Sequence, residues 1–371
     1  MVNKGFIVTT KINFSHIPNT AALPAAQRAA VLENPGFGTA FTDHMAVIEY
    51  TQGVGWHDAR VQPREAISLH PAAAVLHYAQ EIFEGLKAYR LPSGEIAMFR
   101  PTANAERFQA SAERLAMPIL PAELFVQSLE QLIRADQAWV PSEPDKSLYL
   151  RPFMFANEAF LGVRPAKSFM YAVIACPVGG YFKGGAEAVS VWVSEHYSRA
   201  ATGGTGAAKC GGNYAASLLA QSEASANGCD QVAFLDAAEH RWLEEMGGMN
   251  MFFVFNDGSL LTPPLGGTIL PGITRNSLIT LARAAGITVR EERYAFSQWR
   301  EDAASGRLRE AFACGTAAVV TPIGKLKFNG GEALIGDGAH AGPTTKMLKD
   351  SLVQIQCGKA QDPYGWVHRV A

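Results

Sequence analysis

The feature that most constrains this chain is a break near its middle, where residues 177–185 read PVGGYFKGG. One Pro and four Gly within this stretch disfavour both helix and strand, so it predicts a connection between separately folded parts. At 371 residues the chain also exceeds the size at which single cores stop growing, about 250–300 residues. We therefore expect two domains, residues 1–176 and 188–371, joined by an interdomain loop of residues 177–187.

The first part of the chain mixes the periodicities of strands and helices. Its predicted elements are a hairpin of residues 44–51 and 58–62, a buried helix over 72–85, an amphipathic helix over 103–116 and an apolar strand over 169–176. We expect Gly85 to end the buried helix and Pro177 to stop the apolar strand. The first part is therefore predicted to be the smaller domain, of α/β type.

The second part opens on residues 189–194, in which valine alternates with serine or tryptophan. This alternation predicts a strand with two distinct faces. Further predicted elements are strands over 231–236, 251–255 and 287–294, a turn at 256–258 that leads to a short return strand, and helices over 274–285 and 344–356. The second part is therefore predicted to be β-rich, with helices packed outside.

The composition excludes several classes of protein. Hydrophobic residues make up 48% and charged residues 18%, which favours a large core over disorder. A net charge of -2 lacks the excess of positive charge that is typical of proteins that bind nucleic acid. The N-terminus lacks a signal-peptide pattern, and no apolar run approaches the ~18 residues of a membrane span. Five scattered cysteines and nine dispersed histidines argue against disulfides and a metal site, so a reducing cytoplasm is the expected compartment.

A single lysine, Lys209, stands among small residues in ATGGTGAAKCGGNYAASLLAQ, residues 201–221. If it is buried, desolvation lowers its pKa and supplies the neutral amine that a Schiff-base lysine needs. The local composition is equally compatible with a solvated surface loop. A phosphate-binding P-loop is excluded, because Lys209 lies between Ala208 and Cys210 instead of between Gly and Ser or Thr.

Three more segments carry groups that suit a phosphorylated ring cofactor. In LEEMGGMNMFFVF, residues 243–255, a carboxylate at a strand end can hold a ring nitrogen protonated. In ILPGITRNSLITLARAAG, residues 269–286, the first amides of a helix, at Ile273 and Thr274, can bind phosphate. In ACGTAAVVTP, residues 313–322, the amides of a Gly-Thr turn can hold an anion. Taken singly, each segment has a more common interpretation. The first would be an exposed acid, the second a helix start that binds nothing, and the third a simple turn.

Together these segments resemble the fold-type IV pyridoxal-phosphate enzymes, and among them the branched-chain amino acid aminotransferases. The motifs KxGGNY, ExGGMN, LPGITR and GTAA occur in the family's order. The first half agrees as well, in FGTAFTDHM (37–45), LHPAAAVLHYAQEIFEGLKAYR (69–90), FRPTANAERF (99–108), LYLRPFMFANEAFLGV (148–163) and CPVGGYFKGG (176–185). The resemblance extends from about residue 37 to 371. It implies an α/β (α+β) fold whose larger, C-terminal domain is a β-rich pseudo-barrel with outer helices.

The resemblance implies roles for the residues that would hold pyridoxal 5'-phosphate. Lys209 corresponds to the lysine that forms the Schiff base and shuttles the proton. Tyr214 corresponds to the tyrosine on the cofactor's phenolic oxygen, and Glu245 to the glutamate on its pyridine nitrogen. The residues that correspond to phosphate ligands are Arg107, Ile273, Thr274 and Thr316.

The resemblance also implies a substrate pocket shared between two subunits. The positions that match pocket-lining residues are Phe37, Tyr78, Phe83, Tyr149, Arg151, Tyr181, Thr316 and Ala317. Thr316 and Ala317 resemble the turn that binds both phosphate and the substrate carboxylate. Leu161 and Val163 resemble the loop that the other subunit of a homodimer contributes. The expected partners are therefore small-molecule substrates, namely amino acids and 2-oxo acids, and a second copy of the chain.

The implied reaction is reversible amino transfer between L-leucine, L-isoleucine or L-valine and 2-oxoglutarate, which gives branched-chain 2-oxo acids and L-glutamate. D-amino acid aminotransferases and aminodeoxychorismate lyases share the cofactor motifs, but FTDHM and FEGLKAYR favour the branched-chain group. A cofactor-binding protein without catalysis is a further alternative, against which the retention of Lys209, Tyr214 and Glu245 argues. Two departures are notable: residues 318–321 lack the CxxC of mammalian members, and Gly248 replaces a threonine of some members.

Overall fold

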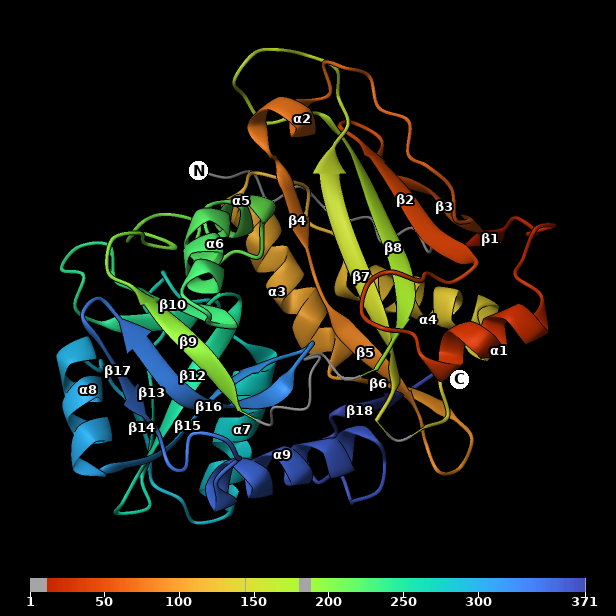
Figure 1. The fold of residues 1–371 in the computed structure, drawn as a ribbon. Helices are drawn as coiled ribbons and strands as arrows, with labels where there is room; N and C mark the ends of the chain where they lie inside the picture. The colour runs from red at the N-terminus through yellow and green to blue at the C-terminus, as the bar shows by residue number, and fades with distance from the viewer. Residues whose placement is uncertain (1–11, 144, 180–187, 371) are drawn as a thin grey trace.

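The computed structural model describes residues 12–143, 145–179 and 188–370, and two β-sheets form its centre (Figure 1). The first sheet lies to the upper right in this view and is built mainly from the first half of the chain. The second lies to the lower left and is built from residues after 188, with helices on its outer side. A mixed α/β fold, as the sequence predicts, is confirmed.

The first sheet has the strand order β1-β3-β2-β8-β7-β5-β6-β18, and β4 pairs with β7 beside this path. Its strands are β1 (Ser15–His16), β2 (His44–Thr51), β3 (Gly55–Pro63), β4 (Glu81–Phe83), β5 (Leu86–Arg90), β6 (Ile96–Phe99), β7 (Ser147–Ala156), β8 (Ser168–Val178) and β18 (Val367–Arg369). The helical segments of this half are α1 (Ala25–Glu33), α2 (Ala74–Tyr78), α3 (Pro101–Arg114), α4 (Ala122–Ala135) and the 3₁₀ turn η1 (Gln137–Trp139).

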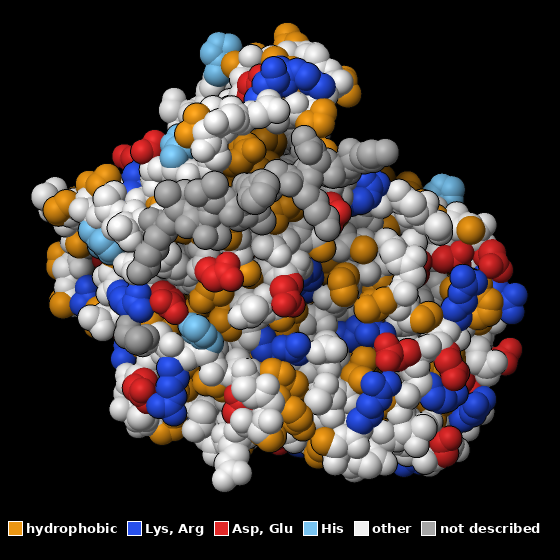
Figure 2. Space-filling model, turned by 180° about the vertical axis from the view of Figure 1, so that it is seen from behind, with side chains coloured by type: hydrophobic (Ala, Val, Ile, Leu, Met, Phe, Trp, Pro, Cys, Tyr) orange, Lys and Arg blue, Asp and Glu red, His pale blue; other side chains and the backbone are white. Residues whose placement is uncertain are grey.

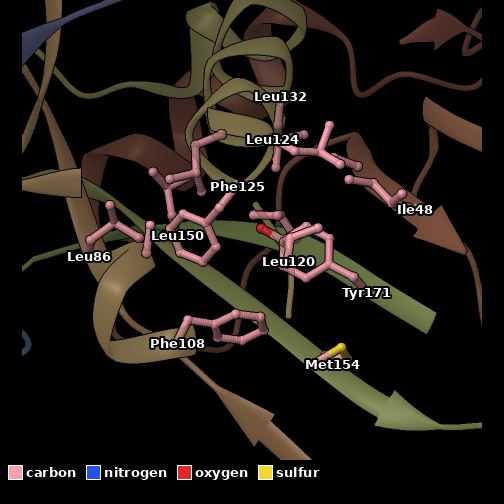
Figure 3. Packing of buried hydrophobic residues seen from close by; sticks show 14 of the residues in the cluster. Ile48, Leu86, Phe108, Leu120, Leu124, Phe125, Leu132, Leu150, Met154 and Tyr171 are labelled. Atoms are coloured by element: carbon pink, nitrogen blue, oxygen red, sulfur yellow. The ribbon is translucent and has the colours of Figure 1, made fainter. Parts of the chain in front are cut away.

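Helices α3 and α4 cover one face of this sheet, and the core lies between them and the strands (Figure 3). Phe108 of α3 meets Tyr171 of β8 edge to face, with ring centroids 5.6 Å apart. The hydroxyl of Tyr171 lies 2.9 Å from that of Ser128, so the polar end of this buried ring has a partner. This packing fixes α3, which also carries Arg107, a residue of the candidate site.

The second sheet closes into a barrel. Its order is β11-β10-β9-β16-β15-β12-β13-β14. Because β11 also pairs with β12, the strands β11, β10, β9, β16, β15 and β12 form a closed ring. The bounds are β9 (Val189–Ser194), β10 (Gln231–Leu235), β11 (Leu243–Met246), β12 (Met249–Phe255), β13 (Leu260–Thr262), β14 (Val289–Glu291), β15 (Leu308–Gly315), β16 (Val319–Phe328) and β17 (Gly331–Leu334). The barrel-like second half implied by the resemblance is therefore confirmed.

Every residue of β12 is buried, because both faces of this strand are covered. Met251 and Phe253 belong to the core that includes α8, whereas Phe252 and Val254 belong to the core that includes α7 and α9. The helices of this half are α5 (Gly211–Ala215), α6 (Leu218–Ala226), α7 (Ile273–Ala284), α8 (Phe296–Ser305) and α9 (Pro343–Gln356). The helices packed outside, as predicted, are α7, α8 and α9 (Figure 1).

Most elements with a strong local pattern form where the sequence predicts them. Residues 44–51 and 55–63 pair as the antiparallel hairpin β2–β3, and α3 begins at Pro101 and ends at Arg114. The alternating segment forms β9, and the turn at 256–258 connects β12 to the antiparallel β13. Helices α7 and α9 begin within one residue of their predicted starts.

Three local predictions are wrong. Helix α2 ends at Tyr78 instead of near Gly85, because Ala79 takes a left-handed conformation and residues 81–83 pair with β7 as β4. Strand β8 does not stop at Pro177, which pairs with Leu148 of β7. Beyond Val173 the described residues of β8 pair with β7 and no longer with β2, so a residue without an N–H is tolerated there. Only the middle of 287–294 is strand, as the three-residue β14.

The C-terminal strand β18 pairs with β6, so the end of the chain returns to the first sheet. The division into domains at residues 176 and 188 stays a prediction, and most of the loop 177–187 lies outside the described residues. No described helix is long and apolar enough to cross a bilayer. On the face shown in Figure 2, basic and acidic side chains are interspersed.

Candidate active site

A cavity of about 260 Å³ lies between the two sheets and is lined by residues from both halves of the chain. From the first half come Phe37, Phe83, Gly85, Arg107, Tyr149 and Arg151. From the second half come Lys209, Tyr214, Gln231, the residues 248–250, 272–274 and 314–318, and Leu270. The four motif segments found in the sequence therefore converge on one cavity.

Lys209 is held in this cavity by its own backbone. Its N–H donates to the hydroxyl of Ser111 at 2.9 Å, and its carbonyl accepts from the N–H of Phe83 at 3.0 Å. Two residues later, the N–H of Gly211 donates to the carboxylate of Glu81. These bonds join the Lys209 segment to α3 and β4, so the first half of the chain positions a lysine that the second half supplies.

The Lys209 amine donates a hydrogen bond to the hydroxyl of Tyr214 at 2.7 Å and lies 4.7 Å from the ring centroid of Phe83. Burial, with the nearby Arg107 guanidinium, lowers the pKa of Lys209 to about 8. Burial also raises the pKa of Tyr214 to about 12, so its hydroxyl keeps its proton. Near pH 7 about a tenth of the amine is therefore uncharged, far more than for an ordinary lysine, and available as a nucleophile or base.

Glu245 is buried beside the cavity, with an exposed fraction of 2%. It does not line the cavity, but Asn250 and Leu270, which do, donate hydrogen bonds to its carboxylate at 3.3 and 2.6 Å. The Nε of Arg199 lies 2.9 Å from the other carboxylate oxygen. Burial raises the pKa of Glu245 to about 7, and Arg199 opposes that rise.

Arg107 forms a buried, bidentate ion pair with Glu84, with N···O distances of 2.7 and 2.8 Å. Asn104 and the N–H of Gly85 donate to the same carboxylate. Burial alone would raise the pKa of Glu84, but Arg107 outweighs it and holds the pKa below its usual value. Arg107 also donates to the carbonyl of Pro271 at 3.2 Å, which brings its guanidinium to the start of α7.

The start of α7 faces the cavity through Gly272, Ile273 and Thr274. No described side chain caps this helix, so its first amides remain available to a ligand. A helix N-terminus favours an anion, and the guanidinium of Arg107, which Glu84 holds in place, supplies further N–H donors at the same end of the cavity. This end is therefore suited to a phosphate group.

The turn between β15 and β16 forms another wall of the cavity, through Thr316 and Ala317. The hydroxyl of Thr316 donates to the carbonyl of Gly85 at 3.1 Å. The amine of Lys87 donates to the carbonyl of Ala317 at 2.9 Å. Both bonds join the barrel to the first sheet, and both fix the turn whose amides the sequence predicts to bind an anion.

Not every residue of the predicted substrate pocket lines the cavity. The residues that line it are Phe37, Phe83, Tyr149, Arg151, Thr316 and Ala317, whereas Tyr78, Leu161 and Val163 do not line it in a single chain. The hydroxyl of Tyr78 donates to the carbonyl of Leu161 at 2.5 Å, so these residues lie together at the surface. Tyr181 falls outside the described residues.

Arg151 brings a cation to the apolar side of the cavity. Its Nη2 donates to the hydroxyl of Tyr149 at 3.1 Å, and the guanidinium lies 4.8 Å from the ring centroid of Phe83. Its Nε is buried and has no hydrogen-bond partner among the described residues. Because Arg151 lines the cavity, its guanidinium can offer a positive charge to an anionic group bound there.

Sequence reasoning missed several charged residues that organise the site, chiefly Glu84, Lys87 and Arg199. Their partners lie 23, 230 and 46 positions away along the chain. The available signal was compositional, since a charged residue inside an apolar segment such as IFEGLKAYR requires a partner when it is buried. That signal identifies the residue but not its partner. No cluster of potential metal ligands is present in the described part of the chain.

Comparison with known proteins agrees with this geometry. Residues 81–326 match the family described as amino-transferase class IV. Over 355 residues the chain is 53% identical to a probable branched-chain-amino-acid aminotransferase of Streptomyces coelicolor. This match covers 95% of this chain and 98% of that protein. Over 349 residues the chain is 56% identical to the branched-chain-amino-acid aminotransferase of Mycobacterium tuberculosis H37Rv. This match covers 93% of this chain and 95% of that protein.

A solved structure shares the fold as well. It is the branched-chain aminotransferase of Thermobaculum terrenum in its PLP-form. The TM-score is 0.70 at 25% sequence identity, and the match covers 88% of this chain and 98% of that one. The likeness therefore extends over both halves of the molecule.

Proposed function

This chain belongs to the class IV aminotransferases, and we propose that it is a branched-chain amino acid aminotransferase. The reaction is reversible amino transfer between L-leucine, L-isoleucine or L-valine and 2-oxoglutarate. The observation that carries the proposal is the buried Lys209 amine, which contacts Tyr214 in the cavity. A buried carboxylate lies beside this cavity, and an uncapped helix start forms part of its wall.

The cavity fits pyridoxal 5'-phosphate. Arg107 and the amides of Ile273 and Thr274 would hold its phosphate, with Thr316 nearby. Tyr214 would bond its phenolic oxygen, Glu245 its ring nitrogen, and Lys209 its aldehyde carbon. When bound, the cofactor supplies an electron sink for the pair of electrons that remains after the substrate's α-proton leaves.

Lys209 moves the proton. With a pKa of about 8 its amine is partly neutral near pH 7, so it can take the proton from the α-carbon of the amino acid. In the half-reaction that consumes 2-oxoglutarate, the protonated amine returns a proton to the α-carbon. The hydroxyl of Tyr214, 2.7 Å from Nζ, orients the amine between these tasks.

The two kinds of substrate differ in their side chains, and the cavity offers a group for each. The rings of Phe37, Phe83 and Tyr149 provide an apolar wall for the side chains of leucine, isoleucine and valine. The guanidinium of Arg151, which lines the cavity, provides a positive charge for the side-chain carboxylate of glutamate or 2-oxoglutarate. The turn at Thr316 and Ala317 would bind the α-carboxylate, which both substrates share.

We further propose a homodimer in which each subunit completes the other's site. Leu161 and Val163 have exposed fractions of 67% and 89%, which is unusual for neighbouring apolar side chains on one loop. A second copy of the chain would cover them. The five cysteines are all free and buried, which supports a reducing compartment such as the cytoplasm.

The test is an assay of the purified full-length chain, loaded with pyridoxal 5'-phosphate, for glutamate formed from L-leucine and 2-oxoglutarate. Lys209→Ala should lower turnover by at least ~10²-fold and abolish the visible absorbance of the bound cofactor, because the base and the covalent anchor are lost together. Lys349→Ala, at an exposed position on α9, is the matched control and should behave as the unmodified chain.

Two results would contradict the proposal. Near-normal turnover in Lys209→Ala would remove the lysine from the reaction. Preference for D-alanine over L-leucine would indicate the D-amino acid aminotransferase alternative.

A further inference from the structure

Two consecutive carboxylates of β11, Glu244 and Glu245, are both buried, with exposed fractions of 7% and 2%. Neighbouring residues of a strand point to opposite faces, so the two side chains do not share one environment. Glu245 reaches partners at the cavity, whereas Glu244 lines a separate cavity on the other side together with Thr268, Trp242 and Arg293. The function proposed above gives no role to Glu244.

Thr268 connects Glu244 to the candidate active site. Its hydroxyl donates to the carboxylate of Glu244 at 2.5 Å, and its carbonyl accepts from Nη2 of Arg199 at 2.6 Å. The Nε of the same arginine lies 2.9 Å from Glu245. A continuous chain of contacts therefore runs from Glu244 through Thr268 and Arg199 to Glu245.

The charges along this chain do not balance. Arg199 is one buried cation between two buried carboxylates, and its other contact, at 3.1 Å, is to the neutral carbonyl of Gly206. Glu244 also feels Asp236, which is anionic, and Arg293, which is exposed and therefore screened by solvent. Glu245 also feels Lys209, but that amine donates to Tyr214 and is not a member of this chain of contacts. With both carboxylates ionised, the group Glu244, Arg199 and Glu245 carries a net charge of about −1.

We propose that Glu244 is a positioning residue that acts through Thr268 and Arg199, and that its charge makes this group favour a positively charged, protonated ring nitrogen in a ligand held against Glu245. Without Glu244, Arg199 and Glu245 would form a neutral pair with less attraction for a proton on the ring. The inference deepens the proposed function and rests on it, because it requires the pyridine ring of pyridoxal 5'-phosphate at Glu245.

The contacts of Glu244 oppose the loss of its charge. Burial raises the pKa of Glu244, and one carboxylate oxygen has no hydrogen-bond partner among the described residues. The Thr268 hydroxyl and Arg199 oppose that rise. Loss of the Thr268 hydroxyl should therefore favour the protonated, neutral acid and should act in the same direction as Glu244→Gln, with a smaller effect.

The experiment compares two ligands on the cofactor-free, full-length chain. One is pyridoxal 5'-phosphate with a ¹⁵N-labelled ring, and the other is an analogue in which a C–H group replaces the ring nitrogen. Glu244→Gln keeps an oxygen for Thr268 but removes the charge. It should weaken pyridoxal 5'-phosphate binding and lower the pKa of the ring nitrogen, read from its ¹⁵N shift, by about tenfold in each equilibrium constant. Affinity for the analogue should stay within about twofold.

Three further variants control this result. Thr268→Val should move the ring-nitrogen titration in the same direction, and Thr268→Ser, which restores a hydroxyl, should return it toward the unmodified chain. Glu239→Gln removes an exposed acid from the turn before β11 and should change neither ligand's affinity.

Equal weakening of both ligands by Glu244→Gln would show a purely structural role and overturn the inference. An unchanged ring-nitrogen titration in Glu244→Gln, with a clear change in Glu245→Gln, would overturn it as well. Failure of the unmodified chain to bind pyridoxal 5'-phosphate at all would instead contradict the proposed function, so the two failures are distinguishable.

Discussion

At the scale of a residue, the chemistry of Lys209 follows from its surroundings. The amine donates to the neutral hydroxyl of Tyr214. Among the nearby cations, Arg107 has the largest effect, and it repels a positive charge on the Lys209 amine. Burial and this repulsion both disfavour the ammonium form. The same lysine on the surface would titrate near its ordinary value of about 10.4 and would be almost fully charged at pH 7.

The first prediction concerns the pH dependence of this amine. In the cofactor-free chain, reductive methylation of Lys209, followed by mass spectrometry of its peptide, should rise with a midpoint near pH 8. A short unstructured peptide with one lysine, whose amine titrates near ~10.4, gives the reference curve. Between these values the unfolded chain binds more protons at this position, so the contribution of Lys209 to stability increases with pH across that window. A midpoint for Lys209 equal to that of the reference peptide would contradict the burial argument.

At the scale of an element, the start of α7 depends on close contact between backbone and side chain. A Cβ on Gly272 would overlap the side-chain oxygen of Asn250. Asn250 in turn donates to Glu245 and to the carbonyl of Leu270. The loop that enters α7 is therefore fixed by the same asparagine that contacts the buried acid, and both ends of the candidate cofactor site share one support.

The second prediction tests that support. Gly272→Ala should displace the first turn of α7 and weaken binding of pyridoxal 5'-phosphate about tenfold or more, equivalent to ~1.4 kcal/mol. Gly266→Ala, in the same loop, is the matched control, because a Cβ there meets no atom within 4 Å. Fluorescence titration of both variants gives the two dissociation constants. Equal affinities would show that α7 tolerates the displacement and that its first amides do not hold the phosphate.

At the scale of the whole molecule, the surface loop around Leu161 is the part of the candidate substrate pocket that a single chain leaves open. Phe160 packs on the first-sheet core, but Leu161 and Val163 point to solvent, beside the exposed Tyr78. Apolar side chains that gather on a surface typically mark an interface. Association would bury them and could bring them to the neighbour's cavity.

The third prediction concerns this loop. Leu161→Asp should raise the KM for leucine by about tenfold or more, because a charge would face an apolar substrate, while cofactor affinity stays unchanged. Leu334→Asp, on the exposed strand β17, is the control and should leave the KM unaltered. Light scattering under assay conditions gives the oligomeric state. A fully active monomer would contradict the shared site, and so would a dimeric Leu161→Asp variant with normal leucine kinetics.

The sequence by itself determined the elements whose signals are local. The hairpin β2–β3, the helices α3, α7 and α9, and the turn before β13 follow from periodicity, proline and glycine within a few residues. The motif resemblance also identified the main residues that line the cavity, among them Lys209, Tyr214 and Arg107. Local energies are sufficient for these features, because each depends mainly on its immediate neighbours in the chain.

Only the tertiary structure decided the features that depend on distant partners. Residues 81–83 read as the end of a helix until β7 pairs with them, and Pro177 reads as a stop until β8 extends beside β7. The ion pairs of Glu84 with Arg107 and of Glu245 with Arg199 join segments that no local pattern connects. Strand pairing and the pairing of buried charges gain their free energy from contacts between distant segments. They can therefore override local preference, and a local sequence pattern cannot predict them.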